Sequence, residues 1–265
     1  MEFRTIVKVE KPSFQIAPFE RMLFVGSCFA DSMGQRFVAE KFRATVNPYG
    51  VMYNPASILH TIEQTDEAPK VAVLTLGTNH VYVLKETNEI VDNCQKRPQS
   101  LFREEELTVD ECVGYLSQAI EVLQNREPKV KIIVTVSPIR YAKYGYHGSQ
   151  LSKATLLLAT NRLVQKYPDV VTYLPAYEIV NDELRDYRFY KEDMLHPSEQ
   201  AVEYIWQRFS EVFFSDEAKT FIEEWRPIKE ALAHRPFNPE SEEYQNFLKR
   251  TQEQKEALFD KYTLH

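Results

Sequence analysis

Five short runs of mainly apolar residues constrain the fold of this chain more than any other feature. They cover residues 22–25, 44–47, 71–76, 130–136 and 170–174. Most of the runs are continuously apolar, which is typical of parallel strands that are buried on both faces. Helical periodicity lies between most of them and predicts an open, doubly wound α/β sheet with right-handed crossovers. A flavodoxin-like spatial order 2-1-3-4-5 fits five such strands better than a barrel does.

The segments between the runs carry helix and turn signals. An apolar residue recurs at every fourth position after the first run. A capping box formed by Thr108 and Glu111 begins a helix ahead of the fourth run. Another helix is predicted over about 150–166. One stretch departs from the alternation: residues 80–84 and 89–91 flank a turn and predict a hairpin inserted after the third strand.

The chain beyond residue 214 has a different pattern. Two amphipathic segments follow, and a stretch with two prolines at 234–239 separates them because proline interrupts a helix. With 265 residues and 43% hydrophobic content, the chain can bury one sizeable core. We therefore predict an α/β domain over 1–214 and a helical extension over 215–265 that packs on the same domain.

Composition excludes several classes of function. The formal net charge is -7 and basic residues are interspersed with acidic ones, so nucleic acid is not an expected partner. The first residues lack the apolar core of a signal peptide, and no run approaches the roughly 20 apolar residues of a membrane span. We expect a cytoplasmic protein without a membrane partner. Three cysteines fit a reducing compartment, and no motif has zinc-ligand spacing, so neither metal nor cofactor is expected.

The first candidate site follows the first strand, because ligands in open α/β sheets bind beyond the carboxyl ends of the strands. Gly26 permits a sharp turn, and Ser27 and Cys28 then stand at the start of a helix. This position favours an anion and lowers the pKa of a thiol. The alternative is that Ser27 caps the helix and Cys28 fills space in the core. Taken alone, the turn supports both interpretations about equally.

Two further candidate sites follow the second and third strands. A loop at 47–55 contains Gly50 and two Asn-Pro pairs, and it reads as a rigid loop that presents backbone N–H groups. The third strand is followed by Gly77, Asn79 and His80, where the amide of Asn79 is placed to donate a hydrogen bond to an oxyanion. Asn and Pro are also common in ordinary turns, which is the more frequent explanation for either loop by itself.

The last candidate site follows the fifth strand. Asp193 stands three residues before His196, and a carboxylate there can bind Nδ1–H and leave Nε2 as a base. Pro197 suits the first turn of the next helix. The motif is weak alone, but the fold brings it to the same sheet edge as the Gly-Ser-Cys turn. Arg140 and His147, which follow the fourth run, are expected to line the cleft.

These motifs together resemble those of a known family. Residues 26–30, GSCFA, resemble the signature of the GSCFA family, which is grouped with the SGNH (GDSL-type) hydrolases. Other similar segments are NPYGVMYNP at 47–55, TLGTNHVY at 75–82, TVSPIR at 135–140, LSKATLLL at 151–158 and DELRDYRFYKEDMLH at 182–196. The resemblance extends from about Phe24 to beyond Arg235.

The resemblance implies roles for the candidate residues. Oxyanion donors come from Gly50 and Asn79, and the Asp193–His196 pair supplies the base. In the SGNH turn the nucleophile is the second residue after glycine, and this register falls on Cys28. Cysteine is intrinsically nucleophilic.

Ser27 then has another role. It is a capping or oxyanion-side hydroxyl, or it is the nucleophile if the turn is shifted by one residue. The chain also departs from the family pattern. Family members have a longer segment before the third strand and a GTxWVY sequence, whereas this chain has a short link at 62–69 and Asn79-His80. The short link implies a more open site, while Gly77-Thr78-Asn79 matches the general SGNH block GxN.

The implied chemistry is acyl transfer from an ester through an acyl-enzyme. With water as acceptor the protein is an esterase, acting on acetyl groups of a carbohydrate or small-molecule ester. With a sugar hydroxyl as acceptor it is an O-acyltransferase. The competing class is a non-catalytic carbohydrate- or protein-binding module on an SGNH-like scaffold, because a fold alone does not guarantee activity.

Overall fold

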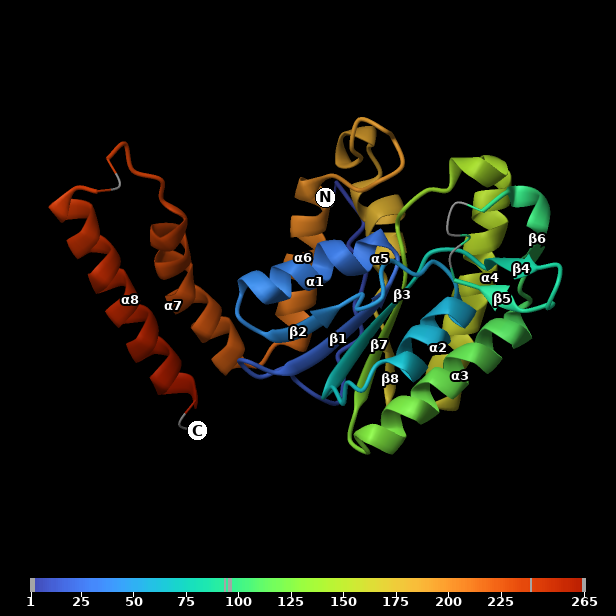
Figure 1. Ribbon diagram of the computed structural model, residues 1–265, viewed down its shortest axis with the longest axis horizontal. Helices are drawn as coiled ribbons and strands as arrows, with labels where there is room; N and C mark the ends of the chain where they lie inside the picture. The colour runs from blue at the N-terminus through green and yellow to red at the C-terminus, as the bar shows by residue number, and fades with distance from the viewer. Residues whose placement is uncertain (1–2, 93, 95–96, 239, 264–265) are drawn as a thin grey trace. The chain divides into compact units, whose positions relative to one another are not determined.

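A five-stranded parallel sheet organises most of the chain in the computed structural model (Figure 1), which describes residues 3–92, 94, 97–238 and 240–263. Its strands are β1 (Arg21–Gly26), β2 (Arg43–Val46), β3 (Val71–Leu76), β7 (Lys131–Val136) and β8 (Val171–Tyr173). Their spatial order is β2-β1-β3-β7-β8, with every pair parallel. The predicted fold class and the order 2-1-3-4-5 are therefore confirmed.

Helices cover both faces of this sheet (Figure 1). One face carries α1 (Cys28–Ala39) and α6 (Glu199–Phe213), and the other carries α2 (Pro55–Gln64), α3 (Val109–Arg126) and α4 (Gly145–Lys166). On the first face the ring of Phe37 lies 4.9 Å from that of Phe24 and 5.4 Å from that of Phe209. On the second, Leu74 and Leu116 belong to one large core. Burial on both faces explains why the strands read as apolar runs.

A small antiparallel sheet follows β3. Its strands are β4 (His80–Leu84), β5 (Ile90–Val91) and β6 (Phe102–Glu106), in the order β5-β4-β6. The predicted hairpin is the β4–β5 pair. The third strand was not predicted, because its sequence FREEE contains one buried residue, Phe102, and no apolar run.

Helix starts differ in part from the predictions. Thr108 and Glu111 form the predicted capping box of α3. The end of the predicted 47–55 loop is instead the start of α2, where Asn54 accepts the N–H of Ser57. Helix α4 begins at Gly145, before the predicted start near residue 150.

The first helical turn after His196 also differs from the prediction. Ser198 Oγ accepts the N–H of Ala201, so α6 begins at Glu199 and Pro197 precedes the helix. The shorter helical segments are η1 (Gln99–Leu101), η2 (Ala142–Tyr144), α5 (Ala176–Glu178), the π-helix η3 (Ile179–Leu184) and η4 (Tyr187–Phe189).

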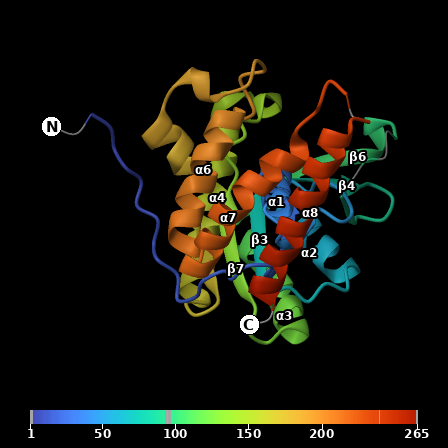
Figure 2. The same ribbon diagram turned by 90° about the vertical axis from the view of Figure 1, so that its left-hand side faces the viewer.

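The chain divides into two compact units. One comprises the residues up to Phe14 together with Glu20–Phe213, and the other comprises Gln15–Phe19 and the chain from Phe214 onward. In the second unit α7 (Asp216–Ala233) and α8 (Glu242–Thr263) lie side by side (Figure 2).

A separate core joins these two helices. It is made by Phe221, Trp225, Ile228 and Leu258. Residues 234–238 between the helices are not helical, as the prolines predict, and Pro239 lies outside the described residues. None of the described helices is both long and apolar enough to cross a membrane.

Candidate functional site

The turn between β1 and α1 requires glycine at its first position. Gly26 has a φ of +145°, and a β-carbon built there would lie 2.1 Å from the carbonyl oxygen of Thr75. Its N–H donates to Oδ1 of Asn47 at 2.9 Å, and Asn47 Nδ2 donates to Asp31 at 2.6 Å. The β2 end of the sheet therefore holds this turn in place.

Ser27 and Cys28 have different surroundings. Ser27 is fully buried, and its Oγ accepts the N–H of Phe29 and lies 3.1 Å from Thr75 Oγ1. Cys28 is the first residue of α1, and its half-buried thiol is hydrogen-bonded to the hydroxyl of Tyr53. Of the two predicted nucleophiles, Ser27 caps the helix and Cys28 is the one that solvent can reach.

The protonation of Cys28 differs from the expectation. Burial raises the pKa of the Cys28 thiol above its ordinary value, and this effect is larger than the lowering of that pKa by the Tyr53 hydrogen bond and the charge of Lys191. The expectation of a lowered pKa is therefore wrong, because desolvation of the thiolate outweighs those favourable contacts. A base is needed to remove the proton at neutral pH.

The predicted pairing of Asp193 with His196 is present. Nδ1 of His196 lies 2.6 Å from Asp193 Oδ2, while Asp193 Oδ1 accepts the N–H groups of Leu195 at 2.8 Å and His196 at 2.9 Å. The two backbone donors and then the imidazole lower the pKa of Asp193 to about 2. The carboxylate fixes the imidazole and leaves Nε2 for proton transfer.

The loop that carries His196 lies near the Cys28 thiol, but the His196 side chain makes no hydrogen bond to that thiol. Lys191 donates its N–H to the carbonyl of His196 at 2.8 Å, and Arg140 donates its N–H to the carbonyl of Leu195 at 3.0 Å. The ammonium of Lys191 is close enough to lower the pKa of Cys28. Between the described side chains of His196 and Cys28 there is no hydrogen bond. Their contact stays a prediction.

The backbone N–H of Gly50 and one of the two N–H groups of the Asn79 amide have acceptors within the chain. The N–H of Gly50 donates to the carbonyl of Asn47 at 2.8 Å and closes a turn. The Nδ2 of buried Asn79 donates to the carbonyl of Leu107 at 2.8 Å. The N–H of Cys28, at the first helical position, is of the kind that helices leave without an internal acceptor.

Gly77 allows a close approach of two tyrosines. A β-carbon at Gly77 would lie 2.3 Å from the hydroxyl oxygen of Tyr141 and 2.9 Å from the carbonyl oxygen of Tyr53. The Tyr53 and Tyr141 rings are perpendicular at 6.2 Å. The Tyr141 hydroxyl oxygen is buried and has no hydrogen-bond partner among the described residues. Burial, and then the neighbouring Tyr53 and Cys28, raise the pKa of Tyr141 well above its ordinary value, so it remains a hydrogen-bond donor.

Lys153 lies beneath this cluster and was not predicted as a site residue. Its Nζ donates to the carbonyls of Gly77 at 2.6 Å and Ser137 at 2.7 Å, and lies 5.0 Å from the centre of the Tyr141 ring. Complete burial lowers the pKa of Lys153 to about 7. The sequence spacing indicates this burial, because Lys153 stands three residues before the buried Leu156 and therefore on the core face of α4.

The remaining predicted residues lie in different surroundings. His80, at the start of β4, stacks on Tyr144 with ring centres 3.6 Å apart, and burial lowers the pKa of His80. His147 is exposed in the first turn of α4. The guanidinium of Arg140 lies over the Tyr146 ring at 4.3 Å.

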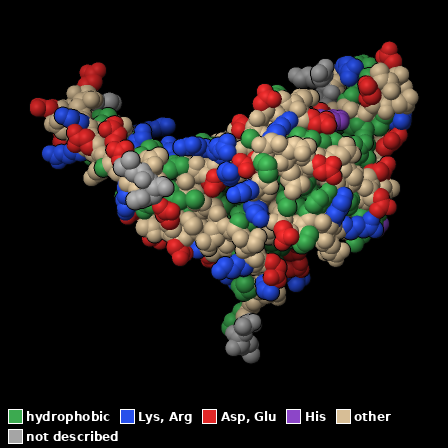
Figure 3. All heavy atoms as spheres, turned by 90° about the horizontal axis from the view of Figure 1, so that it is seen from below, with side chains coloured by type: hydrophobic (Ala, Val, Ile, Leu, Met, Phe, Trp, Pro, Cys, Tyr) green, Lys and Arg blue, Asp and Glu red, His purple; other side chains and the backbone are tan. Residues whose placement is uncertain are grey.

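Basic side chains form no continuous patch on the face seen in Figure 3, and no metal-ligand cluster is found among the described residues. On the face seen in Figure 3, Lys and Arg side chains are scattered among Asp and Glu. Within the described ranges, no group of three His, Cys, Asp or Glu side chains is arranged to hold a metal ion.

Solved structures with a similar fold include a candidate acylhydrolase from Bacteroides fragilis, at 12% identity over 81% of this chain and 92% of that chain, with a TM-score of 0.50. A mutant acetylxylan esterase from Geobacillus stearothermophilus matches at 13% identity over 76% and 98% of the two chains, with a TM-score of 0.48. A lipolytic G-D-S-L family member from Veillonella parvula matches at 14% identity over 72% and 97%, with a TM-score of 0.45. No curated protein matches. Such low identities concern the fold alone.

The family comparison covers most of the chain. The model of the GSCFA family matches residues 21–70 and 63–209, and that of the GSCFA domain protein C-terminal domain matches residues 225–264. The resemblance seen in the sequence is thus confirmed, and the sheet order and the Bacteroides structure agree with an SGNH-like fold. The chain belongs to the GSCFA family.

Proposed function

We propose that this protein is an acyl-ester hydrolase in which Cys28 is the nucleophile and His196 is the general base. The observation that carries the proposal is the preformed hydrogen bond between Asp193 and His196, on a loop whose Lys191 lies close to the Cys28 thiol. A thiol at a helix start, a base at the same sheet edge and a carboxylate behind that base are the parts of a nucleophilic triad.

The proposed reaction transfers one proton at each stage. His196 Nε2 takes the proton of Cys28 while Sγ attacks the ester carbonyl carbon, and the carbonyl electron pair moves to oxygen. The tetrahedral species collapses, its C–O bond breaks, and the alcohol leaves with the proton from His196. Water then attacks the thioester and gives a proton to His196. That proton returns to Sγ as the carboxylic acid leaves.

The N–H of Gly50 closes a turn, whereas the Asn79 amide has a second N–H group beyond its bond to Leu107, and an oxyanion needs further donors. We assign the N–H of Cys28 and the hydroxyl of Tyr141 to this role, since the hydroxyl is buried without an acceptor and its ring lies against Tyr53. A well-placed donor contributes about 3 kcal/mol to the stability of such a transition state. Lys153 has a structural role. Its Nζ donates a hydrogen bond to the carbonyl of Gly77 and lies under the Tyr141 ring.

The loop that carries His196 must close on the thiol for this chemistry. Catalytic hydrogen bonds are often long or absent before substrate binds, and loop closure on a substrate is common in enzymes. Met194 in this loop has a φ of +57°, a strained conformation for a non-glycine residue. We propose that substrate binding shifts the loop and brings Nε2 of His196 to Sγ of Cys28.

The substrate that we propose is an acetyl ester of a carbohydrate. Tyr53, Tyr141 and Tyr146 are placed around the strand ends, and tyrosine rings present apolar faces with polar tips that suit sugars. If a sugar hydroxyl enters in place of water, the same acyl-enzyme makes the protein an O-acyltransferase.

A binding module remains the second candidate function. The raised pKa of Cys28 is the observation that supports it, because a thiol that keeps its proton is a poor nucleophile. In that case the strand ends hold a carbohydrate or protein ligand without cleaving it.

Turnover separates the two candidates. Acetate release from a panel of acetylated sugars should be measurable for the wild type and absent for His196→Ala, with an unchanged circular dichroism spectrum for that variant. His147→Ala is the matched control, because His147 is exposed on α4 and should retain full turnover. Absence of acetate release from every ester, or equal release by His196→Ala, would favour the binding module.

A further inference from the structure

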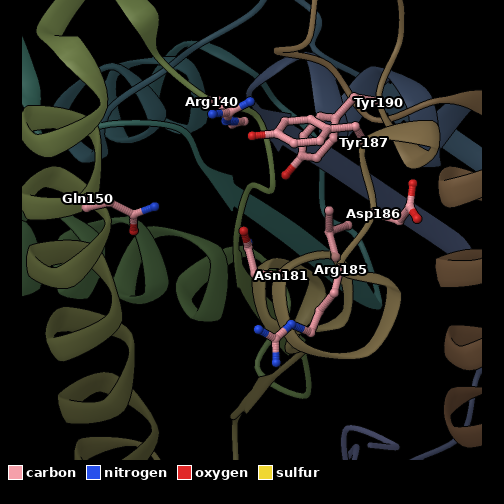
Figure 4. A pocket seen from close by; sticks show the side chains of 8 residues that line it. Arg140, Gln150, Asn181, Arg185, Asp186, Tyr187 and Tyr190 are labelled. Atoms are coloured by element: carbon pink, nitrogen blue, oxygen red, sulfur yellow. The ribbon is translucent and has the colours of Figure 1, made fainter. Parts of the chain in front are cut away.

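A cavity of about 310 Å³ lies beside the loop that carries His196. It is lined by Arg140, Gln150, Val180, Asn181, Arg185, Asp186, Tyr187 and Tyr190. Figure 4 shows the Tyr187 and Tyr190 rings close to Arg140, with Gln150 extending from α4 toward the same space. The volume is at the lower end of the range for small-molecule sites and suits one sugar ring.

Two guanidinium groups of this cavity are not neutralised. In the described part of the chain, neither Arg140 nor Arg185 is paired with a carboxylate, and Arg140 donates its Nη1 to the carbonyl of Met194 at 2.9 Å. The only acid of the lining, Asp186, accepts the N–H of Arg188 at 2.9 Å and lies 3.9 Å from its guanidinium. An arginine fork matches the geometry of a carboxylate or a phosphate. The cavity is therefore suited to an anion.

The lining also suits the ring of a sugar. Tyr187 is exposed, and Arg140 lies 6.0 Å from its ring centre and 5.4 Å from that of Tyr190. An exposed tyrosine face can pack on the C–H face of a pyranose. The Nδ2 of Asn181 donates to the carbonyl of Tyr177 at 2.7 Å, so its Oδ1 is left to accept from a sugar hydroxyl.

Backbone contacts join the cavity to the candidate base. Arg140 holds the carbonyls of Met194 and Leu195, the two residues before His196, and Tyr190 forms a bridge with Pro197, the residue after it. A group bound in the cavity thus contacts residues that fix both sides of His196.

We propose that this cavity binds a sugar ring that carries an anionic group, a carboxylate or a phosphate, as the part of the substrate beyond the scissile ester. The ring packs on Tyr187 beside Arg140, and the anion binds the guanidinium group of Arg185, which lies on the other side of the cavity (Figure 4). The position as a substrate subsite depends on the proposed function, whereas the binding of an anionic sugar does not.

Binding is tested with sugars that carry no ester. Isothermal titration calorimetry of the full chain should compare glucuronate, glucose 6-phosphate, glucose and inorganic phosphate. At least one of the two anionic sugars should bind about tenfold or more tightly than glucose and than phosphate, since charge-assisted hydrogen bonds and ring packing add. Which of the two binds more tightly identifies the anionic group. Added salt should weaken the binding of the anionic sugars more than the binding of glucose.

Variants localise the binding. Arg185→Gln should lower the affinity for the anionic sugar about tenfold, since the substitution removes the charge but keeps a hydrogen-bonding side chain. Arg162→Gln is the matched control, because Arg162 is an exposed arginine paired with Asp110 and is not part of the lining. Tyr187→Ala should lower the affinity for each sugar and leave the affinity for phosphate unchanged.

The outcomes separate this inference from the proposed function. Three results would overturn the inference. The anionic sugars bind no more tightly than glucose, they bind no more tightly than phosphate, or Arg185→Gln leaves their affinity unchanged. Anionic-sugar binding that is retained in a protein without esterase turnover would leave the inference standing and remove the proposed function. Ester turnover without anionic-sugar binding would leave the proposed function standing and overturn the inference.

Discussion

The Nζ of Lys153 lies 2.6 Å from the carbonyl oxygen of Gly77, directly after β3. A fully buried side chain of α4 thus holds the strand end over which the Tyr141 ring packs. Because burial lowers the pKa of Lys153 to about 7, the ammonium is destabilised in the folded protein relative to the unfolded chain.

The first prediction is a pH dependence of stability. Between about pH 7 and about pH 10.4, the unfolded chain holds a proton on Lys153 that the folded protein has released, so the free energy of unfolding rises with pH in this window. Relative to Lys153→Met, the wild type should gain on the order of a few kcal/mol across it. Urea unfolding at a series of pH values measures the difference. A difference that stays flat from pH 7 to pH 10 would mean that Lys153 remains charged.

The second prediction concerns Tyr141. Tyr141→Phe should lower kcat for an acetyl ester by about a hundredfold while KM changes little, because an oxyanion donor acts in the transition state. Stability should be nearly unchanged, since the lost hydroxyl has no partner within the described chain. Tyr144→Phe serves as the control, because Tyr144 stacks on His80. Full kcat in Tyr141→Phe would remove Tyr141 from the mechanism.

The third prediction concerns the reactivity of the cysteines. Iodoacetamide should modify Cys28 faster than buried Cys112, whose pKa burial raises to about 12. The rate at Cys28 should still be rising above pH 8.5, because burial raises its pKa. Tyr53→Phe should shift the profile to higher pH, as the Tyr53 hydrogen bond stabilises the thiolate. Peptide mass spectrometry follows each site, and a plateau already at pH 7 would contradict the raised pKa.

Local sequence signals predict much of this fold. Parallel strands buried on both faces leave apolar runs, and the capping box of α3 is complete within four residues, Thr108 to Glu111. Strand β6 lacks such a signal, because it is charged and forms only by pairing with β4. The start of α2 is ambiguous in sequence, since Asn54-Pro55 suits a turn as well as a helix N-terminus.

The candidate site shows the same division. The Gly26 turn and the Asp193–His196 pair are local arrangements that their own short segments specify. Tyr53 and Tyr141 come from separate loops, and only the tertiary structure brings them together. The pKa of Cys28 depends on burial that no neighbouring residue reveals, which is why the expectation from the helix start had the opposite sign.

Trapping the acyl-enzyme shows directly whether Cys28 is the nucleophile. The full chain is mixed with acetylated sugars, quenched in acid, digested and analysed by mass spectrometry. We expect an acetyl group on the peptide that contains Cys28 and its loss in Cys28→Ala. The acetyl group should be retained in Ser27→Ala if the helix remains folded, because Ser27 caps α1. An acetyl group on Ser27, or turnover that Cys28→Ala leaves unchanged, would contradict the claim that Cys28 is the nucleophile.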